Sequence, residues 1–189
     1  TAELATIYPR LNVKGQDAKT HKFVELGIDP NSPDIRPSII LPPVGNLGFS
    51  DSASAAKAGL APTVIKSDKQ WLTSSEDADR YFFEGNVVAT GTDMNANCSK
   101  IEVVMRRKKP DENPDITQII MTGNVKLTQG LKEAVCGRAD IYADEEMVVL
   151  SDSPVVINRE DNTRATGHRI VYNKGKRGVM IESESSGSK

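Results

Sequence analysis

Residues 115–150 read DITQIIMTGNVKLTQGLKEAVCGRADIYADEEMVVL, and this stretch decides the predicted fold. Apolar and polar residues alternate over residues 121–128, which is the period of a strand buried on one face. Gly123 and Asn124 interrupt the alternation and predict a bulge or bend, because a residue without a Cβ lets the strand change direction. A turn follows, and residues 138–143 alternate again. The stretch therefore predicts a strand–turn–strand unit.

This unit is repeated along the chain. Gly85-Asn86-Val87 recurs 38 residues later as Gly123-Asn124-Val125. A second pattern, small-x-basic-apolar-x-apolar, begins 13 residues after each of these glycines, at residues 98–103 and 136–141, and it returns at residues 167–172. Hairpins of similar length, each too thin to bury its own apolar face, are expected to stack in order. The repeat predicts an all-β protein in which stacked antiparallel hairpins form two walls around an apolar interior.

The composition of the 189-residue chain agrees with a thin structure of this kind. Hydrophobic residues make up 38% and aromatic residues 5% of the sequence, which is little for a thick globular core. The formal net charge of −2 argues against nucleic acid as a partner, since proteins that bind nucleic acid usually carry a basic excess. No apolar run approaches the roughly 18 residues that a membrane-spanning helix needs.

The first third of the chain differs in character from the rest. Residues 1–61 are predicted to be largely irregular, because five of the ten prolines lie between positions 29 and 43. Edge strands are expected here only near residues 6–14 and 22–28. Residues 50–61 fit either a flexible linker or a short capped helix, and we favour the linker.

Residues 62–183 have a regular pattern and predict one β domain, while residues 184–189 are expected to form a disordered tail. The charged stretch at residues 106–114 is expected to be a solvated turn, because acidic residues stand close to its basic ones. Strands are predicted at residues 63–72, 80–89, 96–105, 121–128, 138–143, 147–157, 163–172 and 179–182.

The order and spacing of these motifs resemble the LptA/OstA-like domain family of Gram-negative bacteria. The likeness covers residues 62–182 and implies a slightly twisted β-jellyroll with a V-shaped cross-section. Two departures are that residues 1–61 match nothing in the family and that Pro154 stands where a third glycine would fall. The motifs that carry the likeness are Phe83-Glu84-Gly85-Asn86-Val87, Met121-Thr122-Gly123-Asn124-Val125 and Gly167-His168-Arg169-Ile170-Val171-Tyr172, with Ile65-Lys66-Ser67-Asp68 as the opening strand.

The resemblance also implies a function and partners. Such a protein lies in the periplasm and carries lipopolysaccharide toward the outer membrane, and we expect that a signal peptide has been removed ahead of Thr1. Exposed terminal strands would pair end to end with other periplasmic transport proteins of the same fold or with a second copy of the chain. The alternative is that residues 1–61 fold over one end as a cap, as repeat proteins commonly require.

The predicted lipid-binding groove is lined by apolar residues on one face of the repeated strands. An acyl chain that enters it gains about 0.8 kcal/mol for each CH₂ removed from water. The alternative is a structural or interaction domain of the same fold, in which these residues fill a closed core and no lipid binds. The predicted lining residues are Phe83, Val87, Ile101, Val103, Met121, Val125, Leu127, Ile141, Ile157, Ile170 and Tyr172.

Two further sets of residues recur in the repeats. Cys98 and Cys136 occupy equivalent positions, and in an oxidising compartment they are candidates for a disulfide between neighbouring strands. The alternative is that both merely fill the small position of the repeat. Lys100, Arg138 and Arg169 also recur, and surface ion pairs along the strands explain them as well as contacts to a ligand do.

Signatures of catalysis and of metal binding are absent from the sequence. It contains no nucleophile elbow, phosphate-binding loop, paired-histidine motif or calcium-loop spacing. The two cysteines do not have zinc-ligand spacing, and His21 and His168 lie far apart. We therefore expect no metal, no cofactor and no enzymatic activity. A β-structured enzyme acting on glycans is a third hypothesis, and it predicts carboxylates clustered on one concave face.

Overall fold

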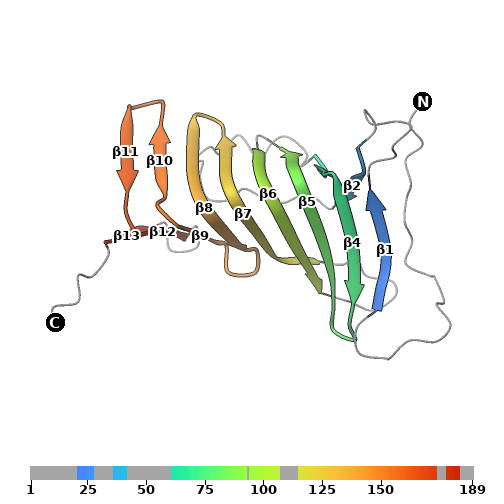
Figure 1. The fold of residues 1–189 in the computed structure, drawn as a ribbon. Coiled ribbons are helices and arrows are strands. Elements are labelled where there is room, and N and C mark those ends of the chain that lie inside the picture. Colours follow the sequence, from blue (N-terminus) through green and yellow to red (C-terminus); the bar gives the residue numbers. More distant parts are fainter. Residues whose placement is uncertain are drawn as a thin grey trace, which may run out of the picture.

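The computed structural model describes residues 21–27, for which only the backbone is considered, and residues 36–41, 61–92, 94–106, 115–173 and 178–183. These residues form one antiparallel sheet of 13 strands (Figure 1). The described residues contain no helix, and the predicted all-β fold of stacked antiparallel hairpins is confirmed. The strands are β1 (His21–Gly27), β2 (Ser38–Leu41), β3 (Thr63–Lys66), β4 (Lys69–Ser74), β5 (Ala78–Gly91), β6 (Met94–Arg106), β7 (Asp115–Gln129), β8 (Lys132–Tyr142), β9 (Met147–Ser151), β10 (Val155–Asn158), β11 (Thr163–Thr166), β12 (Arg169–Asn173) and β13 (Gly178–Glu182).

The sheet is folded into two walls that share the four long strands β5, β6, β7 and β8. One wall runs in the order β1-β4-β5-β6-β7-β8-β9-β12-β13 and is called the lower wall, after its position in Figure 1. The other runs β2-β3-β5-β6-β7-β8-β10-β11 and is called the upper wall. Each long strand contributes one half of its length to each wall. Two walls joined along one line produce the V-shaped jellyroll that the family resemblance implied.

The line along which the walls join, called the corner, is made by bulges in the long strands. In β5 the pairing with β6 shifts between Glu84 and Val87, so that Gly85 and Asn86 bulge. In β7 the pairing with β8 shifts in the same way around Gly123 and Asn124. The φ angles of these four residues are positive, at 81°, 44°, 80° and 51°. Glycine adopts such angles without strain and asparagine tolerates them, so the predicted bend at Gly-Asn is confirmed.

Shorter strands end at the same line and pass from one wall to the other. Ser67 and Asp68 separate β3 from β4, and the Asp68 N–H donates to the Gly85 carbonyl at 3.0 Å. Residues 152–154 separate β9 from β10, and Gly167 and His168 separate β11 from β12. The prediction of a single strand at each of residues 63–72, 147–157 and 163–172 is therefore wrong. Each is a pair of strands, because the chain turns the corner within it.

Both ends of the folded sheet finish in edge strands. β1 pairs with β4 and β2 pairs with β3, so the N-terminal segment adds one strand to each wall. The edge strand expected at residues 22–28 is β1. At the other end β11 pairs with β10 and β13 pairs with β12. Within the described part of the chain nothing pairs with the outer edges of these four strands.

An arginine just ahead of β2 holds this strand to the corner. The Arg36 Nε donates to Asp68 Oδ1 at 3.2 Å, and its Nη2 donates to the carbonyl oxygens of Gly85 and Asn86. Leu41, the last residue of β2, is 5% exposed and belongs to the core. The other predictions for the first 61 residues, for the turn after Arg106 and for the C-terminal tail fall almost wholly outside the described residues.

Candidate functional site

The inner face of the lower wall carries two continuous rows of side chains that cross the strands. In the row nearest the corner each residue is the register partner of the next, from β4 to β12. Every member of this row is 2% exposed or less. The row consists of Gln70, Phe83, Ile101, Met121, Ala139, Leu150 and Ile170. Six of these seven side chains are apolar.

A second row lies one step closer to the open side of the V. Its members are again successive register partners, and all are buried except Tyr81, which is partly buried and packs against the core. The row consists of Leu72, Tyr81, Val103, Ile119, Ile141, Val148 and Tyr172. From β5 to β12 the two rows of the lower wall thus carry only apolar or aromatic side chains.

The upper wall faces these rows with smaller side chains. The row through its middle is Ile65, Ala89, Ala96, Leu127, Ala134, Val156 and Ala165. Val87, Cys98, Val125 and Cys136 lie between this row and the corner. Residues of both walls belong to one contiguous cluster, so the two walls are in side-chain contact.

Ten of the eleven predicted lining residues lie in this cluster, with exposures between 0% and 9%. The exception is Ile157, which is only half-buried. Its register partners are Glu133 and Arg164, and its neighbour Val156 is the residue that pairs with the buried Ala134. Ile157 therefore faces outward, and including it among the lining residues was wrong.

Sequence reasoning missed several members of the cluster. Val148 and Leu150 face inward, but the outward-facing Val149 between them is also apolar and buried, so the run shows no alternation. The alanines of the upper wall carry too little hydrophobic signal to stand out. Ile119 was detectable, because it continues the alternation of residues 121–128 toward the start of β7.

The two cysteines lie on the inner side, and neither is in a disulfide. Cys98 pairs with Val87 on one side, and Cys136 pairs with Val125. The β7 strand runs between them, which places their Cα atoms about two strand spacings, or ~9–10 Å, apart. A disulfide needs Cα atoms within about 7 Å. The structure therefore holds both as free, buried thiols, and the disulfide considered from the sequence is not formed.

Burial also suppresses ionisation of these thiols. It raises the pKa of Cys98 to about 12, an effect that a hydrogen bond with the backbone of Lys100 partly opposes. Burial raises the pKa of Cys136 to about 11. A thiol is nucleophilic only as its thiolate, so both residues are chemically inert at neutral pH. They act as small apolar side chains in the wall.

The basic residues that recur in the repeats are paired with carboxylates on the outer surface. Lys100 lies 3.0 Å from Glu84, and Arg169 lies 3.4 Å from Glu182. Arg138 donates two hydrogen bonds of 2.7 Å to Asp140, and this contact raises the pKa of the guanidinium. These contacts favour the first of the two explanations, surface ion pairing along the strands.

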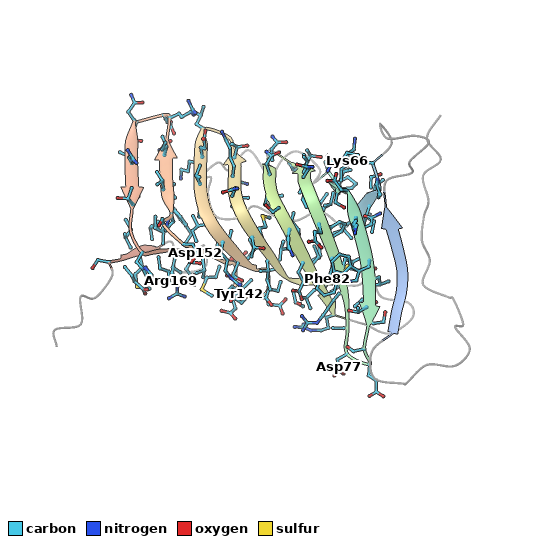
Figure 2. All side chains as sticks on the ribbon, in the orientation of Figure 1. Lys66, Asp77, Phe82, Tyr142, Asp152 and Arg169 are labelled. Atoms are coloured by element: carbon cyan, nitrogen blue, oxygen red, sulfur yellow. The ribbon has the colours of Figure 1, made fainter. Side chains whose placement is uncertain are left out.

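Aromatic side chains also lie on the outer face of the lower wall. Trp71 and Phe82 are register partners, and their rings stack with centroids 5.1 Å apart. Figure 2 places Phe82, Tyr142 and Arg169 along this wall. Phe82 and Phe83 are consecutive in β5, so their rings lie on opposite faces of the sheet. The Phe82 ring covers the outer face, and the fully buried Phe83 ring fills the interior.

The described residues offer little to a metal or to acid–base catalysis. They contain no group of three or more His, Cys, Asp or Glu side chains placed to hold a metal ion. Buried polar residues of the described inner face carry hydroxyl or amide groups, and the buried Asp140 belongs to the outer face of β8. No described helix is long and apolar enough to cross a membrane.

The fold and its apolar interior define a two-walled β-jellyroll, and among the described strands no backbone pairing joins the walls on the side opposite the corner. The family model described as "LptA/(LptD N-terminal domain) LPS transport protein" matches residues 64–178. The chain therefore belongs to this family of lipopolysaccharide transport proteins.

The chain is similar to LptH from Pseudomonas aeruginosa, described as the LptA homologous periplasmic component of the conserved lipopolysaccharide transport device. The two are 16% identical, the match covers 68% of this chain and 87% of that one, and the TM-score is 0.48. No curated protein matches the chain.

Proposed function

We propose that this chain is a periplasmic carrier or bridge that binds the acyl chains of lipopolysaccharide between its two walls and passes the lipid toward the outer membrane. The observation that carries the proposal is the two inner rows of the lower wall, which are continuous across seven neighbouring strands and carry apolar or aromatic side chains at every position except Gln70 in β4. A chain of CH₂ groups lying along these rows from β5 to β12 would meet apolar or aromatic side chains throughout.

The topology supports entry of a chain between the walls. In the described part of the protein the walls share backbone pairing only through the long strands that pass the corner, and no strand of one wall pairs with the other wall across the open side. Separating the walls there breaks side-chain contacts but no backbone hydrogen bonds. Each CH₂ of an acyl chain that moves from water into this space contributes about 0.8 kcal/mol to the free energy of binding.

The terminal strands support association with partners of the same fold. Val179, Met180 and Ile181 of β13 are 57%, 52% and 50% exposed, and the outer edge of β13 has no partner among the described strands. An exposed apolar edge strand is a template for strand addition. We propose that β13 pairs with the terminal strand of a second copy or of another periplasmic transport protein. Such pairing would extend the apolar space between the two walls, which is called the trough.

Site-specific photocrosslinking to lipopolysaccharide tests the proposal. A photoreactive residue at Val125, which is 0% exposed on the inner side of β7, is expected to crosslink to the lipid. The same residue at the neighbouring Lys126 faces outward and serves as the matched control. Equal yields at the two positions, or no yield at either from a folded protein, would count against a groove.

The competing proposal is a structural domain whose interior is filled and binds nothing. The low exposure of the cluster favours it, since Leu127 is 3% exposed and Val103 is 0% exposed. Leu127→Ser separates the two functions. A filled core predicts loss of folding with no lipid binding in the wild type, whereas a lipid trough predicts wild-type binding that the variant weakens at a temperature where it is still folded.

A further inference from the structure

Polar side chains are unevenly distributed along the interior. Six polar or charged residues of the described part are buried, and four of them, Thr63, Ser67, Gln70 and Ser74, belong to β3, β4 or the corner between them. At the opposite end the buried inward side chains of β9 and β12 are apolar or, in Tyr172, aromatic. The trough therefore has a polar end near β3 and β4 and an apolar end near β12.

Among the buried polar residues of the described part, Gln70 is the one in which both side-chain amide atoms lack a hydrogen-bond partner, whereas in Gln129 only Oε1 lacks one. Gln70 is 2% exposed, and in the described part of the chain neither its Nε2 nor its Oε1 has a hydrogen-bond partner. Its neighbours differ: the Ser67 hydroxyl donates to the Lys69 carbonyl at 2.8 Å, and the Ser74 hydroxyl donates to Asp79 at 2.6 Å. A buried amide without partners destabilises the fold, so such a group usually has a role.

Gln70 lies at one end of the trough, where its amide can contact a ligand bound along the inner face. It begins the row that continues through Phe83 and Ile101 to Ile170, and its register partner in β5 is the fully buried Phe83. A ligand that lies along this row and meets the Gln70 amide must therefore be apolar over most of its length and polar at one end.

We propose that Gln70 recognises the amide link of an N-acylated amphiphile, which rests on the proposed lipid-binding function. A primary amide side chain offers one acceptor and one donor group, and an N-acylated head group offers an amide N–H beside its oxygen atoms. The ligand N–H donates to Oε1 while Nε2 donates to an oxygen of the adjoining head group, so both orphaned atoms are satisfied. An ester presents only the carbonyl acceptor, and an ether presents no donor. The bound lipid then lies with its amide at the β3–β4 end and its chain directed toward β12.

The test compares three probes with the same hexose ring, the same C2 attachment and the same chain length: N-tetradecanoylglucosamine, 2-O-tetradecanoylglucose and 2-O-tetradecylglucose, which carry an amide, an ester and an ether link. Calorimetry is expected to show that Gln70→Met lowers affinity for the amide probe about 3- to 10-fold, which is the worth of one or two net hydrogen bonds. Affinity for the ether probe should stay within about twofold, with the ester probe between them. Leu72→Met, on the same strand and the same face, is the matched control and should affect the three probes equally.

Each outcome has a definite meaning. Gln70→Met should melt at or above the wild-type temperature, because it removes an unpaired buried amide without removing volume. If the wild type binds the probes and Gln70→Met weakens all three equally or none, Gln70 does not read the amide and lipid binding still stands. If the folded wild type binds no probe and no lipopolysaccharide, the proposed function itself fails. A shift of the Gln70 side-chain amide resonance with the amide probe alone would support the assignment directly.

Discussion

Ser99 and Gly123 lie against each other across the corner of the V. The Ser99 hydroxyl donates to the Gly123 carbonyl at 3.2 Å, and a Cβ added to Gly123 would stand 2.6 Å from Ser99 Oγ and 2.7 Å from Ser99 Cβ. Gly85 faces Asp68 in the same way, with its added Cβ 2.6 Å from the carboxylate oxygen. The corner is thus built from glycines on one strand that admit a short polar side chain of the next.

We predict that Gly123→Ala lowers the free energy of unfolding by about 2–3 kcal/mol, because it adds a steric clash to backbone strain at a φ of 80°. Urea unfolding followed by circular dichroism measures the change. Gly130→Ala is the matched control, since its φ is also positive at 56° but nothing lies within 4 Å of the added Cβ. Equal losses for the two variants would mean that contact with Ser99 does not contribute.

The raised pKa values of the two thiols predict how the free energy of unfolding depends on pH. In the folded state burial raises the pKa values of Cys98 and Cys136 to about 12 and about 11, against 9.0 for an unperturbed thiol. Above about pH 9 the unfolded chain loses these protons while the folded chain keeps them, so stability falls as pH rises toward the folded values. The expected loss is about 1 kcal/mol per pH unit for each thiol.

Urea unfolding at pH 8 and pH 10 under reducing conditions checks this dependence. The double variant Cys98→Ala and Cys136→Ala should lose less stability over this interval than the wild type, although its small cavities lower stability at both pH values. An identical decline in the two proteins would show that other groups cause it. Slow reaction of both thiols with a disulfide reagent in the folded protein, and fast reaction in urea, should accompany the result.

Much of the fold follows from local patterns. The alternation at residues 121–128 identifies the inner face of β7, and the Gly-Asn pairs identify the corner, because only residues that tolerate positive φ fit there. The corners without that signature were missed. Residues 67–68 and 152–154 turn without a Gly-Asn pair, so the adjoining strands read as continuous.

The site was less accessible to sequence reasoning than the fold. Ile157 was placed inside because it is apolar, but the pairing of β10 with β8 decides its face, and that pairing is a long-range property. The two cysteines illustrate the same limit, because equivalent repeat positions lie two strands apart across β7. Gln70 was not singled out, since a glutamine in a strand pattern signals exposure unless the fold is known.

The contacts of Arg36 predict how firmly the N-terminal strand of the upper wall is held. Arg36→Ala removes hydrogen bonds to Asp68 and to the Gly85 and Asn86 carbonyls, so the amides of β2 should exchange hydrogen faster. Hydrogen exchange read by mass spectrometry measures this. Because Arg36 is partly exposed, global stability should fall by only about 1 kcal/mol. Arg80→Ala, which breaks an exposed pair with Glu102, is the control and should leave β2 exchange unchanged. Unchanged β2 exchange in Arg36→Ala would show that strand pairing alone holds β2.

The apolar edge of β13 predicts a site of self-association. Met180→Lys places a charge on an edge strand, where charges oppose pairing between chains, so the sedimentation coefficient at high concentration should fall toward that of a monomer. Val135→Lys is the matched control, because Val135 is also an exposed apolar residue, at 43%, but belongs to β8 in the middle of the sheet. Both variants should keep the wild-type melting temperature, since neither side chain is buried. If Val135→Lys disrupts association as strongly as Met180→Lys, the chains meet through their faces, and end-to-end strand pairing through β13 is excluded.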